Sequence, residues 1–232
     1  MTDIEKVIRF PFHDRQWVQK LIVGGVLNIV PFIHFFSVGY AYQVYRSSLK
    51  KEEACMPEWK NWDDLFIKGL IVSIICLCYS FLPAFCTVLG VHLVMKGWLA
   101  SFLGGLLCIM GFGSGLFSLF FLPMAIANYI CEGEQIGNAF RFGVIFDKIK
   151  EIQSDYLVSY LVGIGIVILA GLLLWVPTGR YLVFAIGMFY VYLFLAVLFG
   201  ETCATVFEKV ENSEETAIHV VMETEESVGN QV

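Results

Sequence analysis

Charged side chains are scarce in this chain, and long stretches have none. Asp, Glu, Lys and Arg make up 16% of the 232 residues, whereas soluble domains carry about 25%. Each charge-free stretch reaches the roughly 20 residues that an α-helix needs to cross a bilayer. The stretches cover residues 21–45, 69–95, 97–131, 156–179 and 181–200. The shortage of charge excludes an ordinary soluble domain and predicts an all-α protein, a polytopic transmembrane helical bundle over residues 21–207.

The sequence also lacks the motifs that mark common enzymes and cofactor sites. It contains no Walker-type phosphate loop, HExxH, GxSxG or Rossmann fingerprint. Its seven cysteines include no CxxC pair, and their odd number does not fit a disulfide framework. We therefore expect free thiols packed as small apolar groups, no metal or cofactor, and no enzymatic activity.

The negative net charge comes from one end of the chain. Residues 208–232 contain seven glutamates and one lysine, which account for the whole net charge of −6. No aromatic residue follows Phe207. A polar, acidic segment without aromatic side chains is typical of disorder, so an acidic disordered tail is predicted. Its charge, with no basic patch elsewhere to offset it, predicts that nucleic acid is not a partner.

The N-terminal part of the chain contains an interfacial segment and a proline-interrupted run. Residues 1–20 mix aromatic with basic side chains, which suits the headgroup region of a membrane. The run 21–45 has Pro31 near its centre, and proline removes a backbone donor and clashes with the preceding turn. Either one kinked span or a re-entrant pair of half-helices is predicted. The bundle then has five spans, or six membrane segments if the first run is re-entrant at Pro31.

A polar and aromatic loop, residues 46–64, separates the first two runs and contains the sequence CMPEWKNWDD. Pro57 and Glu58 suit the first turn of a helix. Trp59 and Trp62, three residues apart, would share one face of that helix. The favoured interpretation is an anchor with both indoles at headgroup depth. The alternative is a docking motif for a soluble protein or for the chain's own amphipathic helix.

A second segment between runs, residues 134–153, has the pattern of an amphipathic helix. Its apolar side chains at positions 142, 145, 146, 149 and 152 form one helical stripe. Its charged residues fall largely off that stripe. We expect a helix that lies on the membrane or docks under the bundle.

The distribution of Lys and Arg indicates which side of the protein faces the cytoplasm, because these residues favour cytoplasmic loops. With five spans, nine of them lie on one side and six on the other; with a re-entrant first run, the tally is thirteen against two. In both arrangements the loop 46–64, the amphipathic helix and the acidic tail share the richer side. We expect this side to be the cytoplasmic face.

Four polar residues within or at the ends of the runs are candidates for an intramembrane site: Asn28, His34, Asn128 and Glu201. Polar groups at membrane depth are costly and often mark a substrate or ion path. Asn28 and His34 flank Pro31, where they can instead satisfy backbone groups that the proline frees. Glu201 can equally reach a basic partner or the interface. Lys68, near the start of the second span, is expected to extend to the interface as a snorkelling side chain.

Several motifs follow one another in a recognisable order: a tryptophan near the start, GGVLNIVPFI, VGY followed by an arginine, and MPEWKNWDDLFIKGL. Together with a proline-broken second span, this combination resembles the membrane family called domain of unknown function 4013. The most specific parts are the segments 31–40 and 57–69, and the likeness covers most of residues 10–205. Met56 stands where the family usually has leucine. The resemblance implies a polytopic membrane protein of a prokaryote, archaeal or bacterial, and it implies no catalytic residue.

These patterns favour a non-enzymatic scaffold, multi-pass in the cell membrane, that recruits a partner through its cytoplasmic face. The specific features gather on that face, while the spans are mostly apolar. The partners are then the lipid bilayer and a soluble protein, with a homo-oligomer as an open alternative. The candidate interaction or interfacial residues are Pro57, Glu58, Trp59 and Trp62. The second hypothesis is a small transporter or channel with a polar path near Asn28, His34, Asn128 and Glu201.

Overall fold

Every regular element that the structure describes is a helix. The computed structural model describes residues 4–51, 56–175 and 180–229, so residues 52–55 of the polar loop lie outside the described part. In chain order the elements are α1 (Ile4–Arg9), the 3-10 helix η1 (Phe10–His13), α2 (Trp17–Leu27), α3 (His34–Leu49), α4 (Trp62–Val94), α5 (Trp98–Cys131), η2 (Ile136–Phe140), α6 (Phe142–Glu151), α7 (Gln153–Leu172), η3 (Leu173–Trp175) and α8 (Arg180–Gly229). The predicted all-α class is confirmed.

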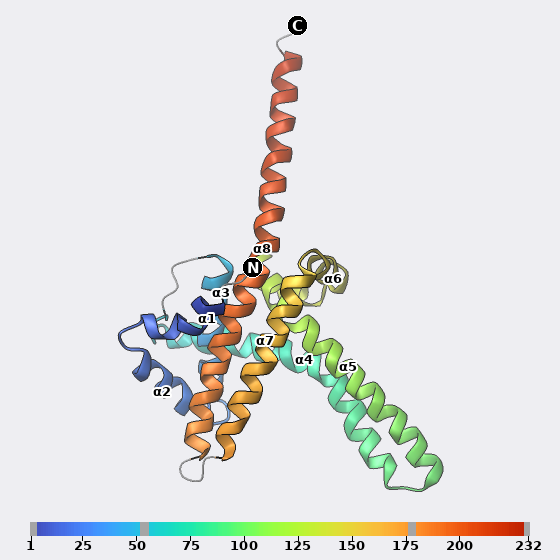
Figure 1. Ribbon diagram of the computed structural model, residues 1–232. Helices are drawn as coiled ribbons and strands as arrows, with labels where there is room; N and C mark the ends of the chain where they lie inside the picture. The colour runs from blue at the N-terminus through green and yellow to red at the C-terminus, as the bar shows by residue number, and fades with distance from the viewer. Residues whose placement is uncertain (1–3, 52–55, 176–179, 230–232) are drawn as a thin grey trace.

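Four helices in the described part are long and apolar enough to cross a membrane: α4, α5, α7 and the Tyr181–Glu208 part of α8. They take up most of the second to fifth charge-free runs. Figure 1 shows them as two hairpins, α4 with α5 and α7 with α8, which diverge from a common region. The prediction of a polytopic helical membrane protein is confirmed, with four long helices in place of five.

The first charge-free run forms two short helices instead of one kinked span. α2 ends at Leu27, the chain turns with Phe32 at a left-handed φ of 68°, and α3 begins at His34. Pro31 lies inside this turn, where its missing N–H costs no helical hydrogen bond. With 11 and 16 residues, neither helix reaches the roughly 20 residues of a full span. The prediction that the first run forms a single kinked span is therefore wrong. The chain breaks at Pro31, as the alternative of two half-helices predicts.

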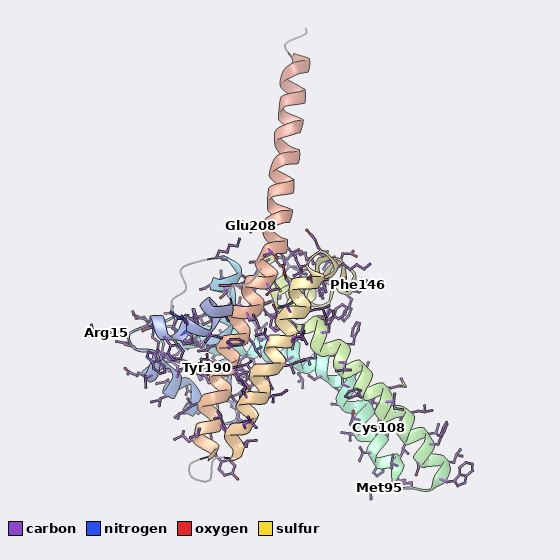
Figure 2. All side chains as sticks on the ribbon, in the orientation of Figure 1. Arg15, Met95, Cys108, Phe146, Tyr190 and Glu208 are labelled. Carbon is purple, nitrogen blue, oxygen red and sulfur yellow. The ribbon has the colours of Figure 1, made fainter. Side chains whose placement is uncertain are left out.

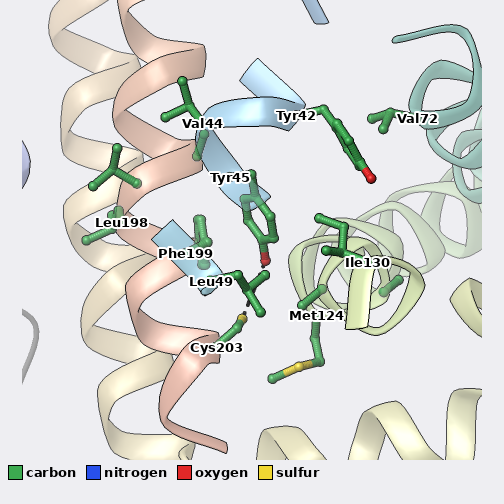
Figure 3. Packing of buried hydrophobic residues seen from close by; sticks show 14 of the residues in the cluster. Tyr42, Val44, Tyr45, Leu49, Val72, Met124, Ile130, Leu198, Phe199 and Cys203 are labelled. Carbon is green, nitrogen blue, oxygen red and sulfur yellow. Dashed lines mark hydrogen bonds between the residues drawn. The ribbon is translucent and has the colours of Figure 1, made fainter. Parts of the chain in front are cut away.

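α3 lies at the centre of the molecule, packed between α4 and α8. The contacts are close because glycines line them. A Cβ on Gly39 would overlap the carbonyl oxygen of Leu65 on α4, and one on Gly200 of α8 would meet the backbone and side chains of α3. Figure 3 shows the buried cluster, in which Tyr45 of α3 points towards Cys203 of α8. The core is thus built around α3, and the long hairpins are attached to it.

The interior proline of α4 leaves a carbonyl that α5 satisfies. Pro83 cannot donate to the carbonyl four residues earlier, which belongs to Tyr79. Ser118 Oγ of α5 donates a hydrogen bond to that oxygen at 2.7 Å. Hydroxyl side chains of neighbouring helices commonly satisfy backbone groups freed by proline inside membranes. The helix therefore continues through its proline.

The same solution is found in α5. Pro123 frees the carbonyl of Leu119, and Tyr160 Oη of α7 donates to this oxygen. Tyr156 Oη, one turn earlier on α7, donates to the carbonyl of Phe120 at 2.8 Å. The two tyrosines therefore join the part of α5 before Pro123 to the second hairpin.

One face of the N-terminal segment packs against the rest of the protein. Phe10 is buried, and Tyr190 Oη of α8 lies 3.5 Å from the carbonyl oxygen of Ile8, to which it donates. Phe12 is exposed instead and meets the ring of Trp17 edge-on, with centroids 4.8 Å apart. The interfacial character predicted for residues 1–20 is thus combined with packing against α8.

α8 continues past its apolar part into the acidic segment. It is one helix from Arg180 to Gly229, and Figure 1 shows its last part extending away from both hairpins. The structure thus has helical backbone where a disordered tail was predicted. Residues 208–229 contain many glutamates and no proline, and glutamate favours a helix. Their composition argues against a packed core, but it does not prevent a helix that continues from α8.

Candidate functional site

A charged junction forms where α3, α4, α5 and α6 meet. We use this name for Tyr42, Arg46, Lys68, Asn128, Glu132, Glu134, Asn138, Arg141 and Lys148. α5 ends beside it, because Gly133 and Glu134 both adopt left-handed backbone, with φ of 81° and 56°. The N–H of Glu134 donates to the Tyr129 carbonyl at 2.9 Å, as in common C-terminal helix stops. This ending places two carboxylates directly after a long apolar helix.

Glu134 joins the loop after α5 to both α3 and α4. Tyr42 Oη of α3 donates to Glu134 Oε1 at 2.7 Å, and Lys68 Nζ of α4 forms an ion pair with the other carboxylate oxygen. Arg46 Nη1 lies 3.4 Å from Oε1. The side chains of Lys68 and Glu134 are only 17% and 26% exposed. The pair therefore neutralises a lysine that lies two turns into α4, directly before the long apolar part of that helix.

Glu132 and Asn128 hold α6 against the end of α5. Lys148 Nζ of α6 donates to Asn128 Oδ1 at 2.6 Å and to Glu132 Oε1 at 2.9 Å. Arg141 Nη1 lies 3.1 Å from Glu132 Oε2. Asn128 is fully buried, and its Nδ2 donates to the carbonyl of Asn138 at 2.8 Å. Both ends of this side-chain amide are therefore hydrogen-bonded, as a buried polar group requires.

The junction keeps both of its glutamates ionised. The hydrogen bond from Lys148 lowers the pKa of Glu132 below its usual value, against the opposing effect of burial. At Glu134 burial acts to raise the pKa, but the hydrogen bonds from Lys68 and Tyr42 outweigh it, and the pKa is again lowered. Carboxylates with lowered pKa values stay charged at neutral pH. Their chemistry here is to fix helices to one another.

The two tryptophans of the polar loop stack on each other and on Tyr40 of α3; we call these three residues the tryptophan stack. The ring centroids of Trp59 and Tyr40 lie 4.3 Å apart, and those of Trp59 and Trp62 lie 5.6 Å apart. Residues 56–61 are not helical, and α4 begins at Trp62 after Asn61, whose φ is 54°. The prediction that both indoles share one helical face is wrong. They meet because the chain bends before the helix.

Backbone carbonyls of the loop accept hydrogen bonds from the core. Tyr40 Oη donates to the carbonyl of Pro57 at 2.6 Å, so Pro57 lies in a fixed loop and does not open a helix. Lys20 of α2 is buried and donates to the carbonyl of Met56 at 2.8 Å. Lys20 also pairs with Asp14, and its hydrogen bond lowers the pKa of that carboxyl. These contacts join the N-terminal segment to the loop before α4.

The side chains of the loop differ in exposure. Trp62 is 44% exposed, whereas Trp59 is partly buried, with its ring 6.1 Å from that of Phe189 on α8. The Nε1 of Trp59 is buried and has no hydrogen-bond partner within the described part of the chain. Glu58 is exposed and pairs with Lys60. Trp62 thus keeps surface for a membrane or a partner, while Trp59 is mainly part of the core.

The four polar residues predicted in or near the spans belong to three different parts of the structure. Asn28 is the C-terminal cap of α2, and His34 is the first residue of α3, so both belong to the turn between these helices. Asn128 belongs to the charged junction. Glu201 is partly buried on α8. Only Asn128 thus lies among the charged side chains of the site.

The sequence pattern missed the acids of the junction. Lys68 was expected to extend to the interface on its own, but in the structure it pairs with Glu134. A signal was present, because a lysine inside an apolar helix requires a partner, and Glu132 and Glu134 directly follow a charge-free run. Which acid meets the lysine depends on how the helices pack, and spacing along the chain does not contain that information.

The predicted amphipathic helix is present but shorter than residues 134–153. The 3-10 helix η2 precedes it, and α6 covers Phe142–Glu151. Ile145 and Ile149 are buried in the bundle, while Phe142 and Phe146 are 47% and 44% exposed. The apolar stripe is therefore divided between the protein core and an outer surface.

The fold and the junction can now be compared with known families. The family described as Protein of unknown function (DUF4013) matches residues 23–179, which is more than half of the chain. The chain belongs to this family. The match with the DUF4013 family includes α3 to α7, and with them the whole charged junction and the tryptophan stack. No curated protein and no solved structure matches the chain.

Proposed function

We propose that this DUF4013 protein is a non-enzymatic membrane scaffold that recruits a soluble protein at the end of the bundle that carries the charged junction. The proposal is carried by the separation of polar and apolar chemistry. Phe146 and Glu208 mark the junction end in Figure 2, and Met95 marks the far end of the α4–α5 hairpin. Lys51 of α3 pairs with Glu208 at the junction end. The ion pairs of the charged junction and that of Lys51 with Glu208 thus lie at one end of the bundle, away from the apolar tip of the α4–α5 hairpin.

The pairing within the junction supports a structural role. Glu134 is occupied by Lys68 and Tyr42, and Glu132 by Lys148 and Arg141. An active site needs an acid, base or nucleophile aimed at a space where a substrate can lie. Here the charged groups are aimed at each other. We therefore assign the junction the task of holding a rigid platform and assign it no catalysis, cofactor or metal.

The helical extension of α8 is the part we assign to partner recruitment. Its backbone projects beyond the bundle (Figure 1) and its sequence from Glu208 onward carries the whole net charge of −6. An acidic helix attracts a protein with a basic surface and repels nucleic acid and a second acidic copy. On the Lys and Arg tally, we assign this end to the cytoplasmic face of a prokaryotic cell membrane.

A small transporter or channel is the weaker proposal. It needs a polar path that links the polar residues of the spans. Asn128, the one fully buried member of that set, is hydrogen-bonded to Lys148 and Asn138 within the junction. Asn28 and His34 lie at a turn outside the long helices. These placements favour structural roles for the polar groups.

Affinity isolation in mild detergent tests recruitment. We would compare the full chain with a chain that ends at Glu208 and with a full-length variant in which the later glutamates are glutamine. Loss of the same basic protein from both variants, with membrane insertion unchanged, supports the proposal. Retention of that partner by both variants contradicts it, and recovery of only a second copy of the chain replaces it with homo-oligomerisation.

A further inference from the structure

The interior prolines of α4 and α5 weaken the two helices in adjacent turns of the hairpin. Pro83 frees the carbonyl of Tyr79, and Pro123 frees that of Leu119. Ser118 donates to the Tyr79 carbonyl, so Leu119, the next residue, lies at the same height in the hairpin as Tyr79. Each helix lacks a backbone hydrogen bond at this height. Paired breaks of this kind form a hinge.

The part of the hairpin beyond this level, residues 80–117, is tightly packed within itself; we call it the arm. Its helices come into backbone contact at Gly90 and Gly104. A Cβ on Gly90 would lie 2.8 Å from the carbonyl oxygen of Gly104, and one on Gly104 would lie 2.6 Å from that of Gly90. Contact between two backbones without room for a methyl group resists sliding of one helix past the other. The arm can therefore move as one body.

The arm has little contact with the rest of the protein. In the most apolar 18-residue stretch of α5, 11% of the residues are buried, whereas 50% are buried in the most apolar stretch of α8. Figure 1 shows the hairpin projecting away from α7 and α8. Its attachment to α7 lies at the hinge level, where Tyr160 and Tyr156 donate to the carbonyls of Leu119 and Phe120. These hydroxyls are placed to fix the angle of the arm.

We propose that the arm is a hinged lever whose tilt follows the thickness of the bilayer, with the Tyr160 hydroxyl as the latch that limits its movement. α4 has 33 residues and is about 50 Å long at the helical rise, whereas the hydrocarbon layer is about 30 Å thick. A helix that is too long for its bilayer tilts or kinks to match it. At the hinge the bend of α4 can change with the bilayer, so that the arm tilts. The base of the hairpin, residues 62–79 and 118–134, stays in place because the ion pairs of Lys68 with Glu134 and of Lys148 with Glu132 fix it.

A distance measurement in bilayers of different thickness tests the lever. Met95 at the tip of the arm and Leu172 at the end of α7 are 86% and 57% exposed. Replacing both with p-acetylphenylalanine lets nitroxides be attached without removing the native cysteines. Pulsed EPR is then recorded in dimyristoleoyl, dioleoyl and dierucoyl phosphatidylcholine. We expect the mean distance between the labels at positions 95 and 172 to be longest in the thinnest bilayer and to shorten as the bilayer becomes thicker.

Three hydroxyl deletions identify the latch. Tyr160→Phe keeps the ring but removes the donor to Leu119, so the distance distribution is expected to broaden and its dependence on thickness to increase. Ser118→Ala is expected to act in the same direction. Tyr190→Phe removes a comparable hydroxyl outside the hinge and is expected to leave the distribution unchanged.

One distance in all three lipids, for the wild type and for both hinge variants, would overturn the proposal. Equal broadening by Tyr190→Phe would also overturn it, because the effect would then not belong to the hinge. If Tyr160→Phe fails to insert, the wild-type series and Ser118→Ala still decide the question.

Discussion

The two ends of the α4–α5 hairpin are held by opposite kinds of chemistry. At the base, Lys68 and Glu134 are shielded from water and bonded across three elements. Along the arm the side chains are apolar and mostly exposed. The arm is attached to the neighbouring hairpin at the hinge level, where a tyrosine hydroxyl of α7 donates to a backbone carbonyl of α5. The comparison shows that the position of a helix is fixed strongly where its charged side chains must be paired. It is fixed weakly where apolar side chains can contact lipid instead of protein.

Damage to the backbone contacts at the base is expected to have the largest effect. Gly39→Ala places a Cβ onto the carbonyl oxygen of Leu65, and neither backbone can yield. We expect a loss of about 3 kcal/mol in the free energy of unfolding, measured by thermal or denaturant unfolding in detergent. Gly105→Ala is the matched variant in the arm, because its Cβ meets nothing within 4 Å. It is expected to be neutral or slightly stabilising, since alanine favours a helix; equal losses for the two would contradict the comparison.

Removal of the lysine at the base is expected to have the next largest effect. Lys68→Met leaves the shielded Glu134 carboxylate without its ion pair, and we expect about 2 kcal/mol of destabilisation. Adding Glu134→Gln removes the stranded charge, so the double variant should lose less than the sum of the two single variants. Strictly additive losses would show that the two side chains do not stabilise each other.

Acid is expected to weaken the base and spare the arm. The pKa values of Glu132 and Glu134 are lowered from 4.5 in the folded protein. Their stabilisation is therefore fully present above that value and is lost as the pH falls through the folded-state pKa values. The melting temperature should be level near neutrality and fall below about pH 4.5. Glu134→Gln should reduce this fall and Gly105→Ala should not; an unchanged fall in Glu134→Gln would contradict the assignment.

The smallest effect is expected in the tryptophan stack. Trp59→Phe keeps an aromatic ring against Tyr40 and removes a buried Nε1–H that has no partner within the described residues. Because burying an unpaired donor is itself costly, we expect a change within about 0.5 kcal/mol. Trp59→Ala, which removes the ring, should cost about 2 kcal/mol. A large loss in Trp59→Phe would show that the indole N–H has a role in binding or folding.

The spacing of charges was sufficient to predict the helices but not their contacts. Charge-free runs predicted the four long helices, and Pro31 predicted the break between α2 and α3. The stack of Trp59 on Tyr40 could not be predicted, because a left-handed residue at Asn61 changes the direction of the chain just before α4. The partner of Lys68 was missed for a similar reason, since ion pairing between helices depends on their packing. The composition of residues 208–232 predicted disorder, whereas the backbone of residues 208–229 is helical, because charge opposes burial more than it opposes a helix.

Two distances recorded in the same set of bilayers test the central comparison most directly. The first joins Met95 at the tip of the arm to Leu172 on α7. The second joins Trp62 at the start of α4 to Phe146 on α6, the helix that Lys148 holds against the end of α5. Both side chains are exposed. We expect the first distance to change with bilayer thickness while the second stays constant. Equal changes in both, or no change in either, would contradict a fixed charged base that carries a hinged apolar arm.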